Sequence, residues 1–381
     1  MWVSLILVSI LIVTDISKAG PLRNRYSKYL ELEPVERFIE YIRIDTSREE
    51  NIKHAIDFWV RQANEVGLPY TVYAPAGKPI FVATLEGSDP SLPSIMLNSH
   101  MDVVTVDETE WMYPPFAGYM DANGDIFGRG TQDTKDISIQ YLEALRKFKK
   151  DNITLARTIH LTVMPDEESG GKNGIKAFIK TKQFKALNIG FALDEGLASG
   201  DDTMIATYVD RRPWQMRFTV HGQGGHGSSI AEETAAEKGG QAPNIIPSKL
   251  SLVVDMRLAP EADADEIQAL VDSWLRETGN GTELSYIRHE KVSLPTVLDD
   301  SNQYWVTLRN TGITVRSMVC PATSDIMNLR NLGIPALGFT AKSNTISRIH
   351  AKNEYINVET FLRGIEIYTE LIKNLGNLIN S

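Results

Sequence analysis

Apolar residues recur at helical spacing in some segments of the chain and form short unbroken runs in others. Apolar side chains three and four residues apart share one face of a helix, whereas a short apolar run is typical of a buried strand. The pattern predicts helices over residues 33–42, 51–66, 136–149 and 174–182, and buried strands over residues 94–98, 158–164, 189–193 and 334–339. Strands that alternate with helices indicate an α/β fold in which helices cover both faces of the sheet.

The middle of the chain follows a different pattern. Apolar and polar side chains alternate over residues 214–220, which predicts a strand with one face in water. The same region has two further predicted strands and one helix, over residues 250–258, 283–290 and 263–278. These elements predict a small α+β domain rather than a continuation of the larger sheet.

The length of the chain supports a division into two domains. A chain of 381 residues is longer than one hydrophobic core usually serves. We predict that the small domain spans residues 208–298 and is inserted into a larger domain formed by residues 20–207 and 299–381. The loops that join the two domains are expected to act as hinges.

The N-terminus carries an apolar run over residues 5–13, followed by the small residues Ser17 and Ala19. The run is too short to span a bilayer comfortably, because a membrane helix needs about 20 apolar residues. It predicts a signal peptide over residues 1–19 and a secreted protein with no stable membrane anchor after cleavage. A retained signal anchor is the alternative.

Composition narrows the choice of partners. The net charge of −10 argues against nucleic acid or an anionic membrane surface as a partner. The single cysteine, Cys320, cannot form a disulfide within the chain. Two glycosylation sequons, at Asn152 and Asn280, are consistent with secretion and predict a glycoprotein.

Histidine and acidic residues follow the predicted strand ends. They are His100 and Asp102, then Asp133 after a glycine turn, then Asp166, Glu167 and Glu168, and finally Asp194 and Glu195. Ligands of open α/β sheets bind outside the carboxyl ends of the strands, so these side chains are expected to meet at one edge. Imidazole and carboxylate groups suit Zn²⁺, and a bridging carboxylate can hold two ions about 3.5–4 Å apart.

Hydrolysis at such a site needs one carboxylate that stays off the metals and accepts the proton of a water. The adjacent Glu167 and Glu168 can divide these tasks, one as base and one as ligand. A carboxylate also commonly orients a ligating histidine. Asp102, two residues after His100 on an extended segment, is placed for that role.

Several segments resemble the signatures of the co-catalytic zinc peptidase family, which includes glutamate-releasing carboxypeptidases, dipeptidases and aminoacylases. The matching segments are residues 99–104, 128–136 and 164–171. Residues 191–198 and 361–364 resemble the aminoacylase branch in particular. The similarity runs from about Glu36 to the C-terminus. It implies a mixed sheet covered by helices, with an inserted lid and dimerisation domain.

The resemblance implies a role for each residue of the site. His100 and Glu195 would bind one zinc ion, Glu168 and His350 would bind the other, and Asp133 would bridge them. Glu167 would be the general base and later the proton donor to the leaving amine, and Asp102 would hold His100. Asp194 is the alternative to Glu195, because either type of acid serves at this position within the family.

In the lid, the resemblance concerns three further residues. His226 resembles the family's histidine that stabilises the oxyanion, and this histidine usually comes from the partner subunit of a homodimer. Asn244 and Arg257 resemble residues that contact the substrate carbonyl and carboxylate. Arginine suits a carboxylate because its planar fork can bind both oxygens.

The chain departs from the family at two places. Only 17 residues separate His226 from Asn244, where the family has a long helix and a strand. Those elements with their loops need on the order of 30–40 residues, so the lid is predicted to be truncated over residues 227–243. Aminoacylases usually carry an arginine at the position of Met327. Its loss suggests a pocket suited to a longer acyl chain.

The sequence thus predicts a secreted, zinc-dependent enzyme that hydrolyses N-acyl-L-amino acids to a carboxylate and a free amino acid. A dipeptidase or carboxypeptidase with the same metals is one alternative. A catalytically silent secreted binding protein is another, because the truncated lid can misplace His226.

Overall fold

The computed structural model describes residues 25–226, 245–278 and 281–379. The predicted signal peptide, Asn244, Asn280 and the truncated stretch of the lid lie outside these residues, so secretion stays a prediction. Asn152, the other predicted glycosylation site, is exposed just beyond a helix. None of the helices within the described ranges is long and apolar enough to cross a membrane.

The larger part of the chain is built on a sheet of eight strands, in the order β1-β2-β6-β3-β7-β15-β8-β14. The strands are β1 (Tyr70–Tyr73), β2 (Ile80–Leu85), β3 (Ser94–His100), β6 (Ile159–Met164), β7 (Ile189–Asp194), β8 (Met204–Asp210), β14 (Val315–Cys320) and β15 (Ala336–Thr340). Strands β6, β3, β7 and β15 run parallel at the centre, whereas β2 and β8 are antiparallel to their neighbours β6 and β15. The sheet is therefore mixed, and the predicted α/β fold class is confirmed.

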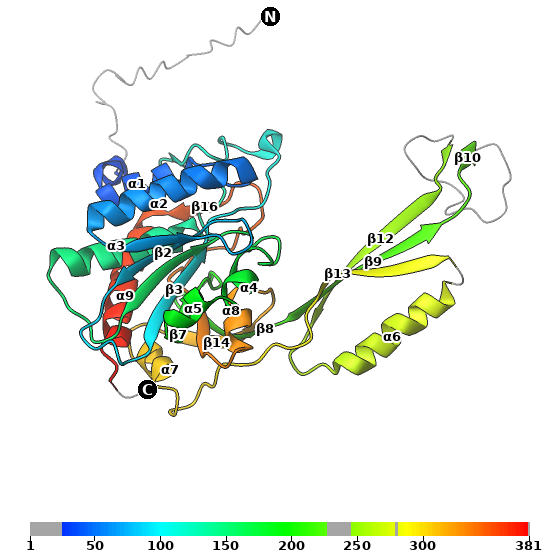
Figure 1. Cartoon of the computed structure of the whole chain (residues 1–381). Coiled ribbons are helices and arrows are strands. Elements are labelled where there is room, and N and C mark those ends of the chain that lie inside the picture. The colour runs from blue at the N-terminus through cyan, green and yellow to red at the C-terminus, as the bar shows by residue number, and fades with distance from the viewer. Residues whose placement is uncertain (1–24, 227–244, 279–280, 380–381) are drawn as a thin grey trace, which may run out of the picture.

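Helices pack on both faces of this sheet (Figure 1). One face carries α1 (Glu33–Ile42), α2 (Ile52–Val66), α3 (Lys135–Lys150), α7 (Gln303–Arg309) and α9 (Val358–Gly376). The other carries the short helices α4 (Ile175–Phe178), α5 (Lys182–Ala186) and α8 (Ile326–Arg330). A smaller sheet, in the order β16-β5-β4, joins Tyr355–Asn357, Asp125–Phe127 and Tyr119–Met120.

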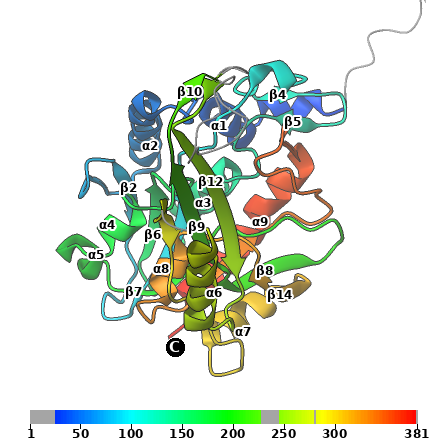
Figure 2. The same cartoon turned by 90° about the vertical axis from the view of Figure 1, so that its right-hand side faces the viewer.

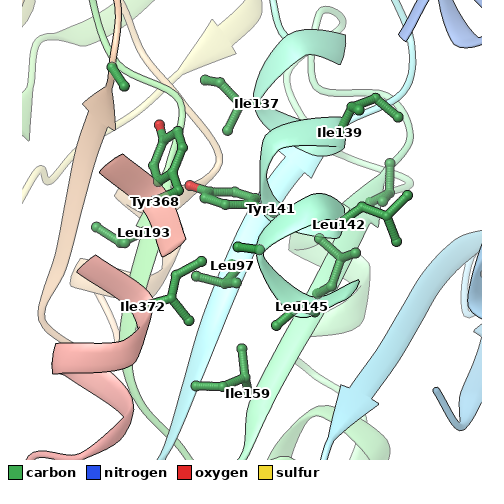
Figure 3. Packing of buried hydrophobic residues seen from close by; sticks show 14 of the residues in the cluster. Leu97, Ile137, Ile139, Tyr141, Leu142, Leu145, Ile159, Leu193, Tyr368 and Ile372 are labelled. Carbon is green, nitrogen blue, oxygen red and sulfur yellow. The ribbon is translucent and has the colours of Figure 1, made fainter. Parts of the chain in front are cut away.

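The strands divide their side chains between two cores, because successive residues of a strand point to opposite faces. Leu97 of β3 packs in the core beneath α3 and α9, whereas its neighbour Met96 packs in the core beneath α4 and α8. Figure 3 shows Leu97 close to Tyr141 of α3 and Ile372 of α9. Burial on both faces holds the strands rigidly and so fixes the position of the residues at their ends.

The inserted part forms a three-stranded antiparallel sheet, in the order β12-β9-β13. It consists of β9 (Arg212–His221), β12 (Lys249–Leu258) and β13 (Thr282–His289), with α6 (Ala264–Glu277) packed on one face. A short pair, β10 (Gly225–His226) with β11 (Ile245–Ile246), lies at its far end. Figure 1 shows that this lid projects away from the larger sheet and is joined to it beside β8, and Figure 2 shows the molecule from the lid side, with α6 and β12 in front.

Candidate active site

The first group of predicted ligands meets where β3 and β7 end. His100 is the last residue of β3 and is 1% exposed, and Glu195 directly follows β7. Nε2 of His100 lies 3.0 Å from Oδ1 of Asp133 and 3.6 Å from Oε2 of Glu195. Parallel neighbouring strands thus deliver two of these side chains to one edge of the sheet, as the strand-end rule predicts.

The second group shares Asp133 with the first. Nε2 of His350 lies 3.2 Å from Oδ2 of Asp133 and 3.0 Å from Oε2 of Glu168. Each histidine therefore faces a different oxygen of the same carboxylate. This is the geometry that a bridging carboxylate needs between two metal ions.

The neighbouring groups of His100 set which nitrogen carries its proton. Nδ1 of His100 lies 2.8 Å from the main-chain carbonyl oxygen of Asp102, and a carbonyl can only accept a hydrogen bond. Nδ1 therefore donates, and the lone pair of Nε2 points toward Asp133 and Glu195. A lone pair and a carboxylate oxygen 3.0 Å apart repel each other unless a cation, either a proton or a metal ion, lies between them.

The residues at this edge fit a pair of metal ions. The ligand atoms within each group, His100–Asp133–Glu195 and Asp133–Glu168–His350, all lie within 4.8 Å of one another. Oε1 of Glu168 is buried and has no hydrogen-bond partner among the described residues. Hydrogen bonds with Asp133 and Glu168 raise the pKa of His350 to about 10. The two carboxylates thus favour a positive charge between themselves and His350, which a bound cation would also supply.

The carboxylate of Asp102 has a different partner from the one predicted. It accepts hydrogen bonds from the main-chain N–H groups of Glu167 and Glu168, at 3.2 and 3.1 Å, and its Oδ1 is 3.9 Å from Nδ1 of His100. Asp102 thus holds His100 through its main-chain carbonyl oxygen. Its side chain instead fixes the turn that carries the adjacent acids Glu167 and Glu168.

Glu167 lies outside both ligand groups but lines the same cavity. Burial, and the negative charge of Glu195, raise its pKa well above the usual value of a glutamate. A carboxylate that is close to the ligands, yet separate from them, can exchange a proton with a reacting group. Glu167 therefore lies beside the ligand groups, and its role as the base stays a prediction.

The cavity has a volume of about 140 Å³ and opposite charges on two of its walls. The larger domain contributes the carboxylates Asp133, Glu167, Glu168 and Glu195, and the lid contributes Arg257 and Arg288. Such a cavity suits a small molecule with an electron-rich group to be activated at one end and an anionic group at the other.

The two arginines differ in how much of each guanidinium is already bound. Nε and Nη2 of Arg257 each lie 3.0 Å from an oxygen of Asp255, and Nη1 lies 3.2 Å from Oγ1 of Thr323. Within the described ranges, the hydrogen bond of the Arg288 side chain is a long one, from Nε to Glu290 at 3.5 Å. Arg288 thus offers the more open fork. Sequence reasoning missed Arg288, which lies within a predicted strand of the lid and belongs to none of the recognised motifs.

His226, another predicted lid residue, lies away from this cavity. His226 is exposed on β10, and Figure 1 shows β10 at the end of the lid remote from β3 and β7. The structure therefore does not bring His226 to the metal ligands of its own chain. Asn244 lies outside the described residues. Met327 is fully buried in α8 and does not line the cavity, so it gives no structural basis for a pocket suited to longer acyl chains.

The chain resembles known proteins over most of its length. Residues 96–374 match the model of peptidase family M20/M25/M40. The chain is 36% identical to aminoacylase-1 of Sus scrofa over 388 residues, covering 90% of this chain and 95% of that protein. It is 35% identical to aminoacylase-1 of Homo sapiens over 389 residues, with the same coverage of both.

Solved structures show the same fold at low sequence identity. The M20 family metallo-carboxypeptidase Sso-CP2 from Sulfolobus solfataricus is 15% identical with a TM-score of 0.76, and the match covers 91% of this chain and 99% of that one. The dipeptidase Dug1p from Saccharomyces cerevisiae is also 15% identical, with a TM-score of 0.77 and coverage of 93% and 98%.

The fold and the paired ligand groups define a metal-dependent amidohydrolase, and the chain belongs to peptidase family M20/M25/M40. Within that family it is a homologue of aminoacylase-1. The resemblance inferred from the sequence motifs is thereby confirmed.

Proposed function

We propose that this protein hydrolyses the amide bond of N-acyl-L-amino acids with two bound zinc ions. The observation that carries the proposal is the carboxylate of Asp133, which faces His100 with one oxygen and His350 with the other. Glu167, which belongs to neither ligand group, lines the same cavity. When bound, a zinc pair supplies Lewis acidity, which polarises a carbonyl group and lowers the pKa of water. The aminoacylase-1 relatives support the choice of substrate.

The chain's own residues would divide the work as follows. His100, Glu195, Glu168 and His350 would hold the metals, with Asp133 between them. The carboxylate of Glu167 would accept the proton of the attacking water and then deliver it to the nitrogen of the leaving amine. A carboxylate suits both steps, because it accepts a proton in its ionised form and can release it again in its protonated form.

The substrate test separates this proposal from its main alternative. An N-acetyl-L-amino acid lacks a free α-amine, whereas the matching dipeptide has one. We expect the purified chain to hydrolyse the N-acetyl amino acid with the higher kcat/KM. Preference for the dipeptide would favour a dipeptidase that uses the same site.

We also propose that the substrate's carboxylate binds the arginines of the lid, chiefly Arg288. Replacing Arg288 with Gln should raise KM by roughly 10- to 100-fold, because a hydrogen bond to a charged group contributes about 1.5–3 kcal/mol and each 1.4 kcal/mol is about tenfold. The change should affect kcat less. Steady-state kinetics with N-acetyl-L-amino acids measures both.

A matched control for this variant is Arg276→Gln, which removes an exposed arginine on α6 of the same lid. Its KM should equal that of the unmodified protein. An unchanged KM in the Arg288→Gln variant would show that the carboxylate binds elsewhere, with Arg257 as the next candidate.

We propose further that two copies of the chain pair through their lids. Strand β12 is at the edge of the lid sheet, and its Leu250, Leu252 and Val253 are 46%, 62% and 52% exposed. An apolar edge strand is a ready surface for pairing with another strand. The remote position of β10 gives a second reason, since His226 can act as an oxyanion donor only at a partner's site.

Mixing two inactive variants tests this pairing directly. We expect His226→Ala to lower kcat by about 10²–10³-fold, as for other oxyanion donors, and Glu167→Gln to be inactive by itself. A mixed dimer would combine intact Glu167 from one chain with intact His226 from the other. Activity should therefore return when the two proteins are mixed and allowed to exchange. A monomeric chain, or a mixture as inactive as its parts, would contradict the proposal.

A further inference from the structure

Glu354 is a fully buried carboxylate in the segment between His350 and β16. Its Oε2 accepts hydrogen bonds from Nη1 of Arg129 at 2.7 Å and from the main-chain N–H of Gly130 at 3.1 Å. Its Oε1 accepts from the main-chain N–H groups of Gln132 and Asp133, at 2.6 and 3.2 Å. A carboxylate can accept all four of these bonds with two oxygens, whereas an amide side chain has only one acceptor oxygen.

These donors all belong to the loop that presents the bridging carboxylate. Residues 128–134 connect β5 to α3, and the loop turns at Gly130, where φ is +93°. The first residue of the loop, Gly128, is also bound to Glu354, because its N–H donates to the main-chain carbonyl oxygen of Glu354 at 3.0 Å. The turn that places Asp133 is therefore wrapped around the Glu354 side chain.

The Gln132 side chain forms further hydrogen bonds between this loop and the segment that carries His350. Nε2 of Gln132 donates to the carbonyl oxygens of Ile346 and Tyr355, at 3.1 and 2.7 Å. Oε1 of Gln132 accepts from the N–H of Arg348 at 3.0 Å. His350 lies between the points where its segment is held, and its φ of +59° shows a tightly turned backbone there.

We propose that Glu354 is a positioning residue that sets the distance between Asp133 and His350 and thereby builds the metal site formed by Asp133, Glu168 and His350. Asp133 and His350 are 217 positions apart in sequence, and Glu354 joins the two segments that carry them. The inference rests on the two-metal assignment of the proposed function. It is independent of which amide the enzyme cleaves.

The proposal predicts a selective effect on one of the two metals. In the Glu354→Gln variant, an NH₂ group would face main-chain N–H donors, so the loop could not keep its place. The affinity of the Asp133–Glu168–His350 site should fall by roughly 10- to 100-fold, as is usual when a residue supporting a ligand is changed. The other site should be affected less, because His100 and Glu195 are carried by the ends of β3 and β7.

The experiment measures metal content rather than turnover. Purified full-length protein is equilibrated in a zinc buffer that just saturates the unmodified chain, and bound zinc is counted by mass spectrometry. We expect two ions for the unmodified chain and one for Glu354→Gln. When Co²⁺ replaces zinc, the visible absorption spectrum of Glu354→Gln should lack the contribution of the Asp133–Glu168–His350 site. The matched control is Glu143→Gln, which alters another buried glutamate. Glu143 lies on α3 and pairs with Arg37 of α1 at 2.6 Å, and its variant should retain both ions.

A folded Glu354→Gln variant that binds two ions with unchanged affinity would overturn the inference while leaving the two-metal site intact. An unmodified chain that binds fewer than two ions would instead overturn the proposed function. If Glu354→Gln does not fold, Glu354→Asp serves in its place. It keeps the charge but withdraws the oxygens by one methylene group, and the same selective loss of one ion is expected.

Discussion

Replacing Glu167 with Gln is expected to lower kcat by about 10²–10⁴-fold while both metal ions stay bound. Glutamine has nearly the same shape but cannot accept the proton of the attacking water. Since Glu167 lies outside both groups of ligands, its loss should leave the metals in place. Steady-state kinetics together with zinc analysis of the purified variant measure the two effects separately.

The neighbouring glutamate provides the matched control. Oε2 of Glu168 lies 3.0 Å from Nε2 of His350, so Glu168→Gln should lower the metal content as well as kcat. The two adjacent substitutions are chemically identical, yet only one should release metal. A Glu167→Gln enzyme with near-normal turnover would show that another group acts as the base.

The Asp133→Asn variant is expected to lose the metal pair and nearly all activity. Its carboxylate is the one group that both ligand sets share, and asparagine offers a single neutral acceptor oxygen in its place. A metal pair contributes several kcal/mol of transition-state stabilisation. At about 1.4 kcal/mol for each factor of ten, its loss corresponds to a fall in kcat of roughly 10³-fold or more.

Thermal unfolding gives an independent measure of this loss. A metal that binds only the folded chain raises Tm, and the rise depends on the metal concentration. The Tm of the unmodified chain should therefore rise when zinc is added, whereas the Tm of Asp133→Asn should change little. Asp151→Asn, at the exposed end of α3, should behave like the unmodified chain. A normal zinc-dependent rise in the Asp133 variant would be incompatible with a bridging role.

The parts of the fold that could be predicted are those whose side chains are buried in a regular pattern. The central strands β3, β7 and β15 contain apolar runs, and β6 is buried throughout although it includes His160 and Thr162, because helices cover both faces of these strands. The hairpin strands β1 and β2 were not predicted, although β2 is almost entirely buried. β1 is mostly exposed and lies at the edge of the sheet, so its sequence shows only a weak hydrophobic pattern.

The helix predicted over residues 174–182 extends past the end of α4 and reaches only the first residue of α5. Helix α4 ends at Phe178, and α5 begins at Lys182 after Thr181. The Thr181 side chain accepts a hydrogen bond from the N–H of Phe184 at 3.0 Å and so starts a new helix. Ile175, Phe178 and Ile179 are at helical spacing, but periodicity alone does not show that the helix they begin ends before Thr181.

The candidate site was predicted best where its residues belong to local motifs. His100, Asp133, Glu168 and Glu195 follow strands or a glycine turn, and the structure brings them together with His350. Arg288 and Glu354 belong to no such local motif. Their importance arises from contacts across the fold, such as the hydrogen bonds from residues 129–133 to Glu354, which no local pattern reveals.

The most direct test of the central claim is a zinc titration of the metal-free chain during hydrolysis of an N-acetyl-L-amino acid. We predict that turnover is absent without metal and reaches its full rate as two zinc ions bind to each chain. Two bound ions without release of the amino acid would contradict the assignment and indicate a silent binding protein. Full turnover in the metal-free chain would contradict it equally.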